Sequence, residues 1–408
     1  MNLKSEQILS NKEVLLDGDQ SLSKEESFRQ IIIQLGEENC TVQKYGHKKV
    51  LMYVDHITNK KTVFLVSSVT YMGGNGVKTL HPAYLKRIQL KNWYKTLVTE
   101  NPFNADNIVF LGVYHYEGNV VFVNVHKDSY LRRKMNNSAA HIYMNDLYQA
   151  MSSGVFTRVD KNNNVITSVK KNEFKMYIDS NLMEKYAIND YQSIISQFNE
   201  VILNDEWLVA KDAIISMHEG KWYQRNAGEW AAMYLEYKFY HFLNNNGYQE
   251  IISYTGKGGN LDLYFTDEGC YGDLKASDIN QKETPANDKE TVDNAILRDG
   301  RLWYIIYQHQ TIKDKDCDYE ATRFRTHYIH DKGEWSKKKP FNELSYHNRM
   351  KNRVKFENML VLEINSANIK HVLTVFKQGK QATGEKRKVK YKISKKSMEN
   401  FVIYRSGK

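Results

Sequence analysis

The chain has 408 residues, of which 41% are hydrophobic and 12% aromatic, so it can form two domains that each bury a core. This composition excludes an intrinsically disordered chain. A membrane helix needs about eighteen consecutive apolar residues, and the sequence has no such run. The segment Met1–Lys12 is polar and lacks the apolar stretch of a signal peptide. Cys40, Cys270 and Cys317 lie far apart, which argues against a disulfide framework. We therefore expect a cytoplasmic protein without membrane contact.

The positive charge is concentrated near the C-terminus. Residues 351–408 contain fifteen Lys or Arg, four Glu and no Asp, a net charge of +11 against +10 for the whole chain. The remaining residues are therefore close to neutral. A basic segment on a near-neutral body indicates either a polyanionic partner or a solvated tail that keeps the chain soluble, and charge alone does not separate these two interpretations.

The first half of the chain mixes helices and strands. A polar N-terminal segment leads to a helix around 24–35, and β-branched runs at 50–54 and 62–69 predict strands. Further predicted elements are a helix or loop at 81–99, a hairpin of 108–116 with 119–125 through Glu117-Gly118, a helix at 141–152, a turn at 160–164 between two short strands, and a largely helical region at 175–203. This order predicts a mixed α+β N-terminal domain over residues 1–200.

The second half has a more regular order. A helix at 223–244 ends at Asn245, Asn246 and Gly247, which are common helix terminators. Strands are expected at 250–254, 260–265 and 270–277, followed by a helix at 290–299 and an apolar strand at 302–308. This order predicts an α/β fold with a mixed sheet flanked by helices, in a domain over residues 201–408.

Two of these strands carry polar residues that suit a catalytic site. In the strand 271–276 side chains alternate between faces, so Asp273 and Lys275 should lie side by side on an exposed face. Asp262 lies on the preceding strand between apolar neighbours, where a carboxylate needs a cationic partner. Carboxylates hold Mg²⁺, which activates water for phosphodiester hydrolysis, and a lysine stabilises the developing charge.

This pattern resembles the PD-(D/E)XK nuclease superfamily, which includes many restriction endonucleases. Asp262, a short hairpin and then Asp273-Leu274-Lys275 match its motif, with Leu261 in place of the proline. The resemblance covers about residues 220–310 and implies a restriction-endonuclease-like core in the C-terminal domain.

Members of this superfamily often carry a glutamate on the helix before the hairpin. Glu236 fits this position better than Glu229, which is the second candidate. The resemblance implies one set of catalytic residues and one overlapping set of metal ligands, with Mg²⁺ as the cofactor and Mn²⁺ tolerated. The catalytic residues are Glu236, Asp262, Asp273 and Lys275, and the metal ligands are Glu236, Asp262, Asp273 and Leu274.

Several basic residues are candidates for contact with nucleic acid. Lys386, Arg387, Lys388, Lys390 and Lys392 alternate with apolar residues, which predicts a strand with one basic face for backbone phosphates or, alternatively, a solubilising edge strand. In the first half, Arg87 and Lys91 lie among aromatic residues, and Arg132 and Arg133 follow the hairpin. The alternative to nucleic-acid contact around Arg87 and Lys91 is an amphipathic helix that buries Trp93.

We therefore expect a type II restriction endonuclease that cuts double-stranded DNA as a homodimer. Residues 1–200 would recognise the target, and a cognate methyltransferase would be a separate protein, because this chain has no methylase motif. The alternatives are a modification-dependent endonuclease, a repair or mobile-element nuclease that reads DNA shape, and a non-catalytic DNA-binding protein with a nuclease-like fold.

Overall fold

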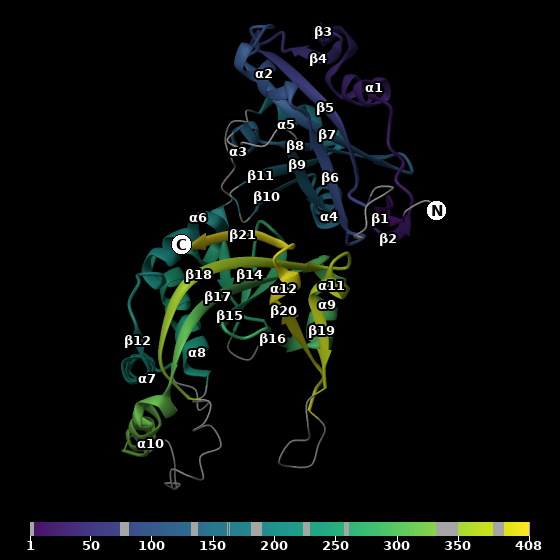
Figure 1. Ribbon diagram of the computed structural model, residues 1–408. Helices are drawn as coiled ribbons and strands as arrows, with labels where there is room; N and C mark the ends of the chain where they lie inside the picture. Colours follow the sequence, from purple (N-terminus) through teal and green to yellow (C-terminus); the bar gives the residue numbers. More distant parts are fainter. Residues whose placement is uncertain are drawn as a thin grey trace. The chain divides into compact units, whose positions relative to one another are not determined.

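The computed structural model describes residues 4–73, 81–131, 138–160, 162, 164–180, 190–222, 229–256, 261–331, 350–377 and 387–407. The chain forms two compact units, residues 1–187 (unit 1) and 188–408 (unit 2). The expected boundary at 200/201 falls within the helix Asp190–Ile202, which belongs to unit 2. Both units combine helices with sheets that contain parallel and antiparallel strands, a mixed α/β architecture (Figure 1).

Unit 1 is built on a nine-stranded sheet with the order β10-β11-β8-β7-β5-β4-β3, in which β6 joins β5 to β9. Only β5 and β7 among these neighbours are parallel. The strands of this sheet are β3 (Cys40–Tyr45), β4 (Lys48–Val54), β5 (Lys61–Tyr71), β6 (Leu85–Leu90), β7 (Asn107–Tyr116), β8 (Asn119–Val125), β9 (Ser138–Tyr143), β10 (Val155–Val159) and β11 (Val165–Lys170). A separate antiparallel pair consists of β1 (Ser5–Ile8) and β2 (Val14–Asp17). The helices of unit 1 are α1 (Lys24–Leu35), α2 (Trp93–Glu100), α3 (Lys127–Leu131), α4 (Met144–Ser153) and α5 (Phe174–Asp179).

Local chemistry explains the elements that were predicted correctly. Ser23 caps α1 by accepting a hydrogen bond from the backbone of Glu26, and the helix ends at Gly36, whose φ is 93°. Glu117 and Gly118 both have positive φ, as the tight β7–β8 turn requires. Phe28 and Ile31 of α1 then pack with Phe64 in the core of unit 1.

The interpretation of residues 81–99 as helix or loop was partly wrong. This region contains the strand β6 before the helix α2. Within β6, Lys86 is completely buried, although it directly precedes the candidate nucleic-acid contact Arg87. The reason is the hairpin β1–β2, which hydrophobic periodicity did not predict because its first strand buries Ser5, Glu6 and Gln7.

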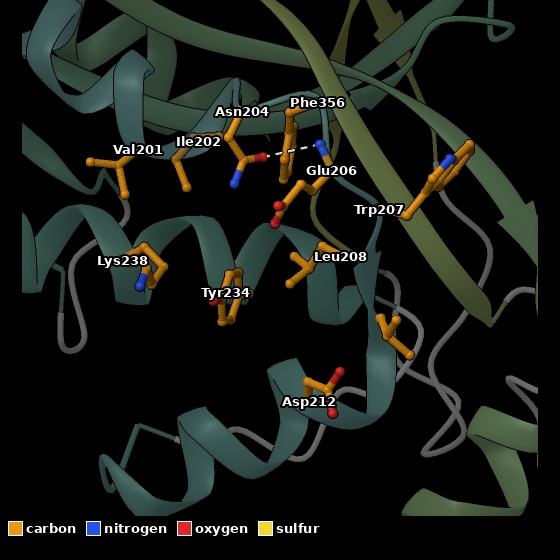
Figure 2. Close-up of a pocket in the computed structure, with 11 residues that line it drawn as sticks. Val201, Ile202, Asn204, Glu206, Trp207, Leu208, Asp212, Tyr234, Lys238 and Phe356 are labelled. Carbon is orange, nitrogen blue, oxygen red and sulfur yellow. Dashed lines mark hydrogen bonds between the residues drawn. The ribbon is translucent and has the colours of Figure 1, made fainter.

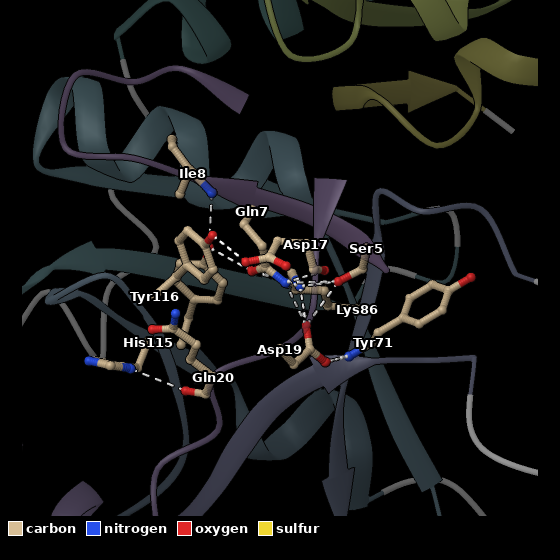
Figure 3. A network of polar contacts seen from close by, with 11 residues as sticks. Ser5, Gln7, Ile8, Asp17, Asp19, Gln20, Tyr71, Lys86, His115 and Tyr116 are labelled. Carbon is tan, nitrogen blue, oxygen red and sulfur yellow. Dashed lines mark hydrogen bonds and ion pairs between the residues drawn. The ribbon is translucent and has the colours of Figure 1, made fainter. Parts of the chain in front are cut away.

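Lys86 is the centre of a polar network in unit 1 (Figure 3). Its ammonium group lies 2.8 Å from Oδ1 of Asp19 and donates to Ser5 Oγ at 3.0 Å and Gln7 Oε1 at 3.3 Å. Tyr114 also donates to Gln7 at 3.0 Å. The network attaches the N-terminal hairpin to β6 and β7, and the buried lysine is satisfied by Ser5 and Gln7 of β1 and by Asp19, which follows β2.

Unit 2 is built on a seven-stranded sheet with the order β12-β18-β17-β15-β14-β13, where β21 also pairs with β18. A separate three-stranded sheet has the order β16-β20-β19. The strands are β12 (Leu208–Val209), β13 (Ile252–Tyr254), β14 (Leu263–Phe265), β15 (Cys270–Asp278), β16 (Glu283–Asp288), β17 (Arg301–Lys313), β18 (Lys351–Asn365), β19 (Leu373–Phe376), β20 (Lys390–Ser394) and β21 (Val402–Gly407). The helices are α6 (Asp190–Ile202), α7 (Ala210–Glu219), α8 (Trp230–Asn245), α9 (Lys289–Asp299), α10 (Glu320–Asp331), α11 (Ile369–Val372) and α12 (Lys395–Met398).

The centre of unit 2 is the apolar strand β17, which pairs in parallel with β15 and antiparallel with β18. Its residues 302–307 are all buried, as its composition predicted. The helix α8 packs against β15 and ends at Asn245, with Gly247 in the left-handed conformation that follows a helix end. None of the described helices is long and apolar enough to span a membrane.

Candidate active site

Asp262 lies immediately before β14, which is shorter than the predicted strand. Its Oδ2 accepts a hydrogen bond of 3.1 Å from the backbone N–H of Leu274 in β15. Asp262 precedes the first residue of β14, and there its side chain replaces the backbone hydrogen-bond acceptor that a longer β14 would offer to β15. The carbonyl of a strand residue points to the same side as its N–H, so the Leu274 carbonyl also faces Asp262.

Asp273 and Lys275 lie side by side on β15, as the alternation predicted, and form an ion pair. The expected exposure was wrong: Asp273 is 2% exposed and the Lys275 side chain 22% exposed. The cause is β16, whose Asn287 donates to Asp273 Oδ1 at 3.0 Å. On the same face, the Lys275 ammonium lies 5.9 Å from the ring centroid of Tyr304 on β17.

Glu236 lies near the middle of α8 and interacts electrostatically with Asp262, Asp273 and Lys275. Glu229 precedes the first residue of α8 and is exposed. The geometry therefore favours Glu236 over Glu229 as the helix glutamate of the cluster. We call Glu236, Asp262, Asp273 and Lys275 the acidic cluster.

The acidic cluster carries more negative than positive charge. Burial, reinforced by the charge of Asp273, raises the pKa of Glu236 to about 7. Burial together with the charges of Asp273 and Glu236 raises the pKa of Asp262 to about 8. Burial opposes the charged form of Lys275, but Asp273 and Asp262 outweigh it and raise the pKa of the lysine. Three carboxylates thus compete for one ammonium group, and protons or a further cation are needed to balance them.

The donor atoms of the cluster fit a magnesium ion in part. Oxygen atoms of Asp262, Asp273 and the Leu274 carbonyl are the kind of ligand that Mg²⁺ prefers, and Mg²⁺ commonly uses one or two carboxylates and keeps several waters. In the described part of the chain, no three His, Cys, Asp or Glu side chains gather closely enough to hold a metal ion. The arrangement therefore fits a two-carboxylate site and does not bring in Glu236 as a third direct ligand.

The basic strand predicted near the C-terminus is β20, and it lies close to the cluster through β16. Tyr391 and Ile393 are buried while Lys390 and Lys392 are partly exposed, which is the predicted alternation. The side chain of Lys392 lies 2.8 Å from Glu283, and that of Lys390 lies 4.0 Å from Asp288, so acids of β16 already contact both.

The other predicted nucleic-acid contacts fall into three groups. Arg387 and Lys388 are exposed and precede β20. Arg87 is a partly exposed residue of β6, and Lys91 is exposed before α2 in unit 1. Lys386, Arg132 and Arg133 lie outside the described residues.

A cavity of about 310 Å³ lies elsewhere in unit 2 (Figure 2). Tyr234 and Lys238 of α8 line it, together with Trp207 and Phe356. No residue of the acidic cluster lines this cavity. We place the candidate active site at the acidic cluster, because there burial and neighbouring charges raise the pKa values of two carboxyl groups, Glu236 and Asp262, next to a lysine.

Sequence reasoning missed Asn287. It lies on β16, and no spacing rule connects an asparagine in the three-stranded sheet with Asp273 on another sheet. A second contact, Ser277 Oγ to Thr284 Oγ1 at 2.7 Å, also joins β15 to β16. These two contacts place β16 over the acidic cluster.

Comparison with known families gives one match, to a family described as methylase-associated X1, over residues 60–178. The match lies within unit 1 and covers less than a third of the chain. Its description is compatible with a restriction–modification context. Comparison with curated proteins and with solved structures gives no match.

Proposed function

We propose that the chain is a Mg²⁺-dependent endodeoxyribonuclease of a restriction–modification system, acting on double-stranded DNA. The observation that carries the proposal is the acidic cluster, where Asp262 contacts β15 beside the ion pair of Asp273 and Lys275, in support of the resemblance to the PD-(D/E)XK motif. The methylase-associated match in unit 1 supports the restriction–modification part. Type II cleavage by a homodimer is the form we favour.

Each side chain of the cluster has a role in this proposal. A bound Mg²⁺ would polarise the scissile phosphate and lower the pKa of a water. Asp262 is positioned by the N–H of Leu274, and Asp273 by the amide of Asn287, so both carboxylates are oriented before a ligand arrives. Lys275 stabilises negative charge on the phosphate oxygens, and Glu236 accepts a proton from the attacking water.

The test is digestion of plasmid DNA by the purified full chain with Mg²⁺, with Mn²⁺ and with excess EDTA. We expect cleavage with either metal and none with EDTA. Asp273→Asn should abolish cleavage, while the same substitution at the exposed turn residue Asp267 should not. Cleavage in EDTA, or by the Asp273 variant, would refute the site assignment.

The same assay separates the alternative functions. Methylated and unmethylated plasmids of one sequence distinguish a type II enzyme, which its cognate methylation should block, from a modification-dependent enzyme, which requires methylation. Branched or damaged substrates test a repair or mobile-element nuclease. DNA binding without cleavage under every metal condition would favour the non-catalytic alternative.

A further inference from the structure

Unit 1 contains a concentration of lysines that come from three distant segments. Lys44, Lys48 and Lys49 lie on the β3–β4 hairpin, Lys24 is the first residue of α1, and Lys91 lies just before α2. In Figure 1, α1, α2 and the two strands gather at one end of unit 1. We call these five lysines, with the rings of Tyr45 and Trp93, the basic hairpin patch.

Specific contacts hold the segments of the patch together. The Lys24 ammonium donates to the backbone carbonyl of Lys49 and lies 5.9 Å from the ring centroid of Trp93. The rings of Tyr45 and Trp93 stack at a centroid distance of 6.3 Å and an interplanar angle of 27°. The patch is therefore part of the folded surface of unit 1, and each segment has a defined place in it.

Like charges crowd one another in the patch. Lys44 and Lys49 are direct cross-strand partners, an arrangement that destabilises an antiparallel pair. Burial and then the charges of Lys91, Lys48 and Lys49 lower the pKa of Lys24. A polyanion that binds here removes this repulsion.

Two acids offset the repulsion only in part. Glu25 forms an ion pair of 3.0 Å with Lys49, and Glu100 accepts a hydrogen bond from Tyr45. Lys44 and Lys91 are exposed, so their ammonium groups are available to a large partner.

We propose that the basic hairpin patch binds the sugar–phosphate backbone of double-stranded DNA. Lysines on a hairpin and at the starts of two helices offer several positive charges to backbone phosphates, which such residues contact without reading base edges. The ring of Trp93 lies under the Lys24 ammonium and stacks on Tyr45, which helps to position Lys24. The choice of DNA as the partner rests on the proposed function. Through this patch, unit 1 would bind DNA independently of its base sequence.

The test measures binding of the full chain to a non-specific DNA duplex in EDTA, so that catalysis plays no part. The variant Lys44→Ala/Lys48→Ala/Lys91→Ala leaves the contacts of Lys24 and Lys49 in place. We expect binding at low salt to weaken at least about tenfold. The plot of log K against log salt should become less steep, by about 0.9 in slope for each lost phosphate contact.

A matched control changes three lysines elsewhere in unit 1: Lys60→Ala/Lys61→Ala/Lys171→Ala. It removes the same charge and should leave the salt slope nearly unchanged. An equal loss in both variants, or an unchanged slope in the patch variant, overturns the inference. If the wild-type chain binds but never cleaves DNA, the nuclease proposal fails and the patch is still judged by its slope. If the wild-type chain binds no DNA at all, the inference is wrong.

Discussion

Each unit contains a mostly or fully buried lysine beside carboxylates, and the two lysines differ in how their charge is balanced. Lys86 forms its ion pair with Asp19, and although burial opposes ionisation, the lysine and neighbouring donors hold the pKa of that carboxyl below its usual value. Around Lys275, by contrast, burial and mutual repulsion raise the pKa values of Glu236 and Asp262. A balanced buried pair is costly to break by removing one partner, whereas a surplus of carboxylates prepares a site for a cation.

The largest expected effect separates the two clusters by activity. Asp262→Asn should reduce DNA cleavage by about 1,000-fold or more, because it removes a proposed metal ligand and its charge. The same change at Asp19 should leave the cleavage rate of the folded protein nearly unchanged. Initial rates of plasmid nicking with saturating Mg²⁺ measure both variants. Equal losses of cleavage rate at Asp262 and Asp19 would show that the two clusters do not differ in function.

The second effect concerns stability. Lys86→Met removes one partner of a buried ion pair and leaves Asp19 without its cation, so we expect a loss of about 3–5 kcal/mol in the free energy of unfolding of unit 1. Urea denaturation followed by circular dichroism measures this loss. Lys61→Met, at an exposed position of β5, is the control and should change stability by less than about 0.5 kcal/mol. A loss below 1 kcal/mol for Lys86→Met would mean that the network is dispensable.

The third effect is the sign of the pH dependence. Without metal, Glu236 and Asp262 keep their protons up to pKa values of about 7 and about 8, whereas the unfolded chain loses them near 4.5 and 3.8. The unfolded state then binds fewer protons, so the stability of unit 2 should fall by several kcal/mol as the pH rises from about 5 to 8, because each proton of difference changes the free energy of unfolding by about 1.4 kcal/mol per pH unit. Asp19 acts in the opposite direction, because its lowered pKa contributes stability that is lost only towards acid pH.

Magnesium should remove most of this fall, since a divalent cation replaces the protons. Thermal melts between pH 5 and 8, with Mg²⁺ and with EDTA, measure the effect. Glu236→Gln/Asp262→Asn provides the control, because a protein without the two carboxyls should show neither the slope nor the response to metal. Stability that rises over this interval in EDTA would contradict the charge assignment of the cluster.

The comparison also shows which features a single sequence can reveal. Asp262, Asp273 and Lys275 could be identified because the motif lies within one hairpin, where alternation and a short turn determine the geometry. The helix α1 and the β7–β8 hairpin were predicted correctly, and a capping serine and a glycine turn explain where they begin or reverse. These signals act between residues close in the sequence, so the tertiary arrangement does not change what they predict.

Long-range polar contacts were not predictable in this way. The network of Lys86 depends on a β1 strand of buried polar residues 79 to 81 positions away in the sequence, for which hydrophobic periodicity has no signal. The cover over Asp273 depends on Asn287 in another sheet, so an expected surface pair became a buried one. Such contacts arise from the tertiary arrangement of segments that carry no recognisable motif.

The smallest expected effect concerns the basic residues near the acidic cluster. Lys390 and Lys392 contact Asp288 and Glu283, so a DNA phosphate would have to compete with these acids. Arg387 and Lys388 are exposed, and the 3.8 Å contact of Lys388 with Glu290 joins two side chains that are 65% and 74% exposed, where solvent screens the pair. We therefore expect Arg387→Ala/Lys388→Ala to lower the slope of log K against log salt by between about one and two, equally for all DNA sequences.

Lys390→Ala/Lys392→Ala is the matched comparison and should lower the slope by less than about one, because its lysines are already partly neutralised. This order of effects follows from the same argument that separates Lys86 from Lys275: a cation paired within the protein supports the fold, and a cation without a close acid is available to a ligand. Filter binding of a non-specific duplex measures both variants. The salt concentration is varied between about 50 and 200 mM, where the affinity of such complexes changes strongly with salt. A larger change for the paired lysines than for Arg387 and Lys388 would show that pairing on β16 does not decide which basic residues contact DNA.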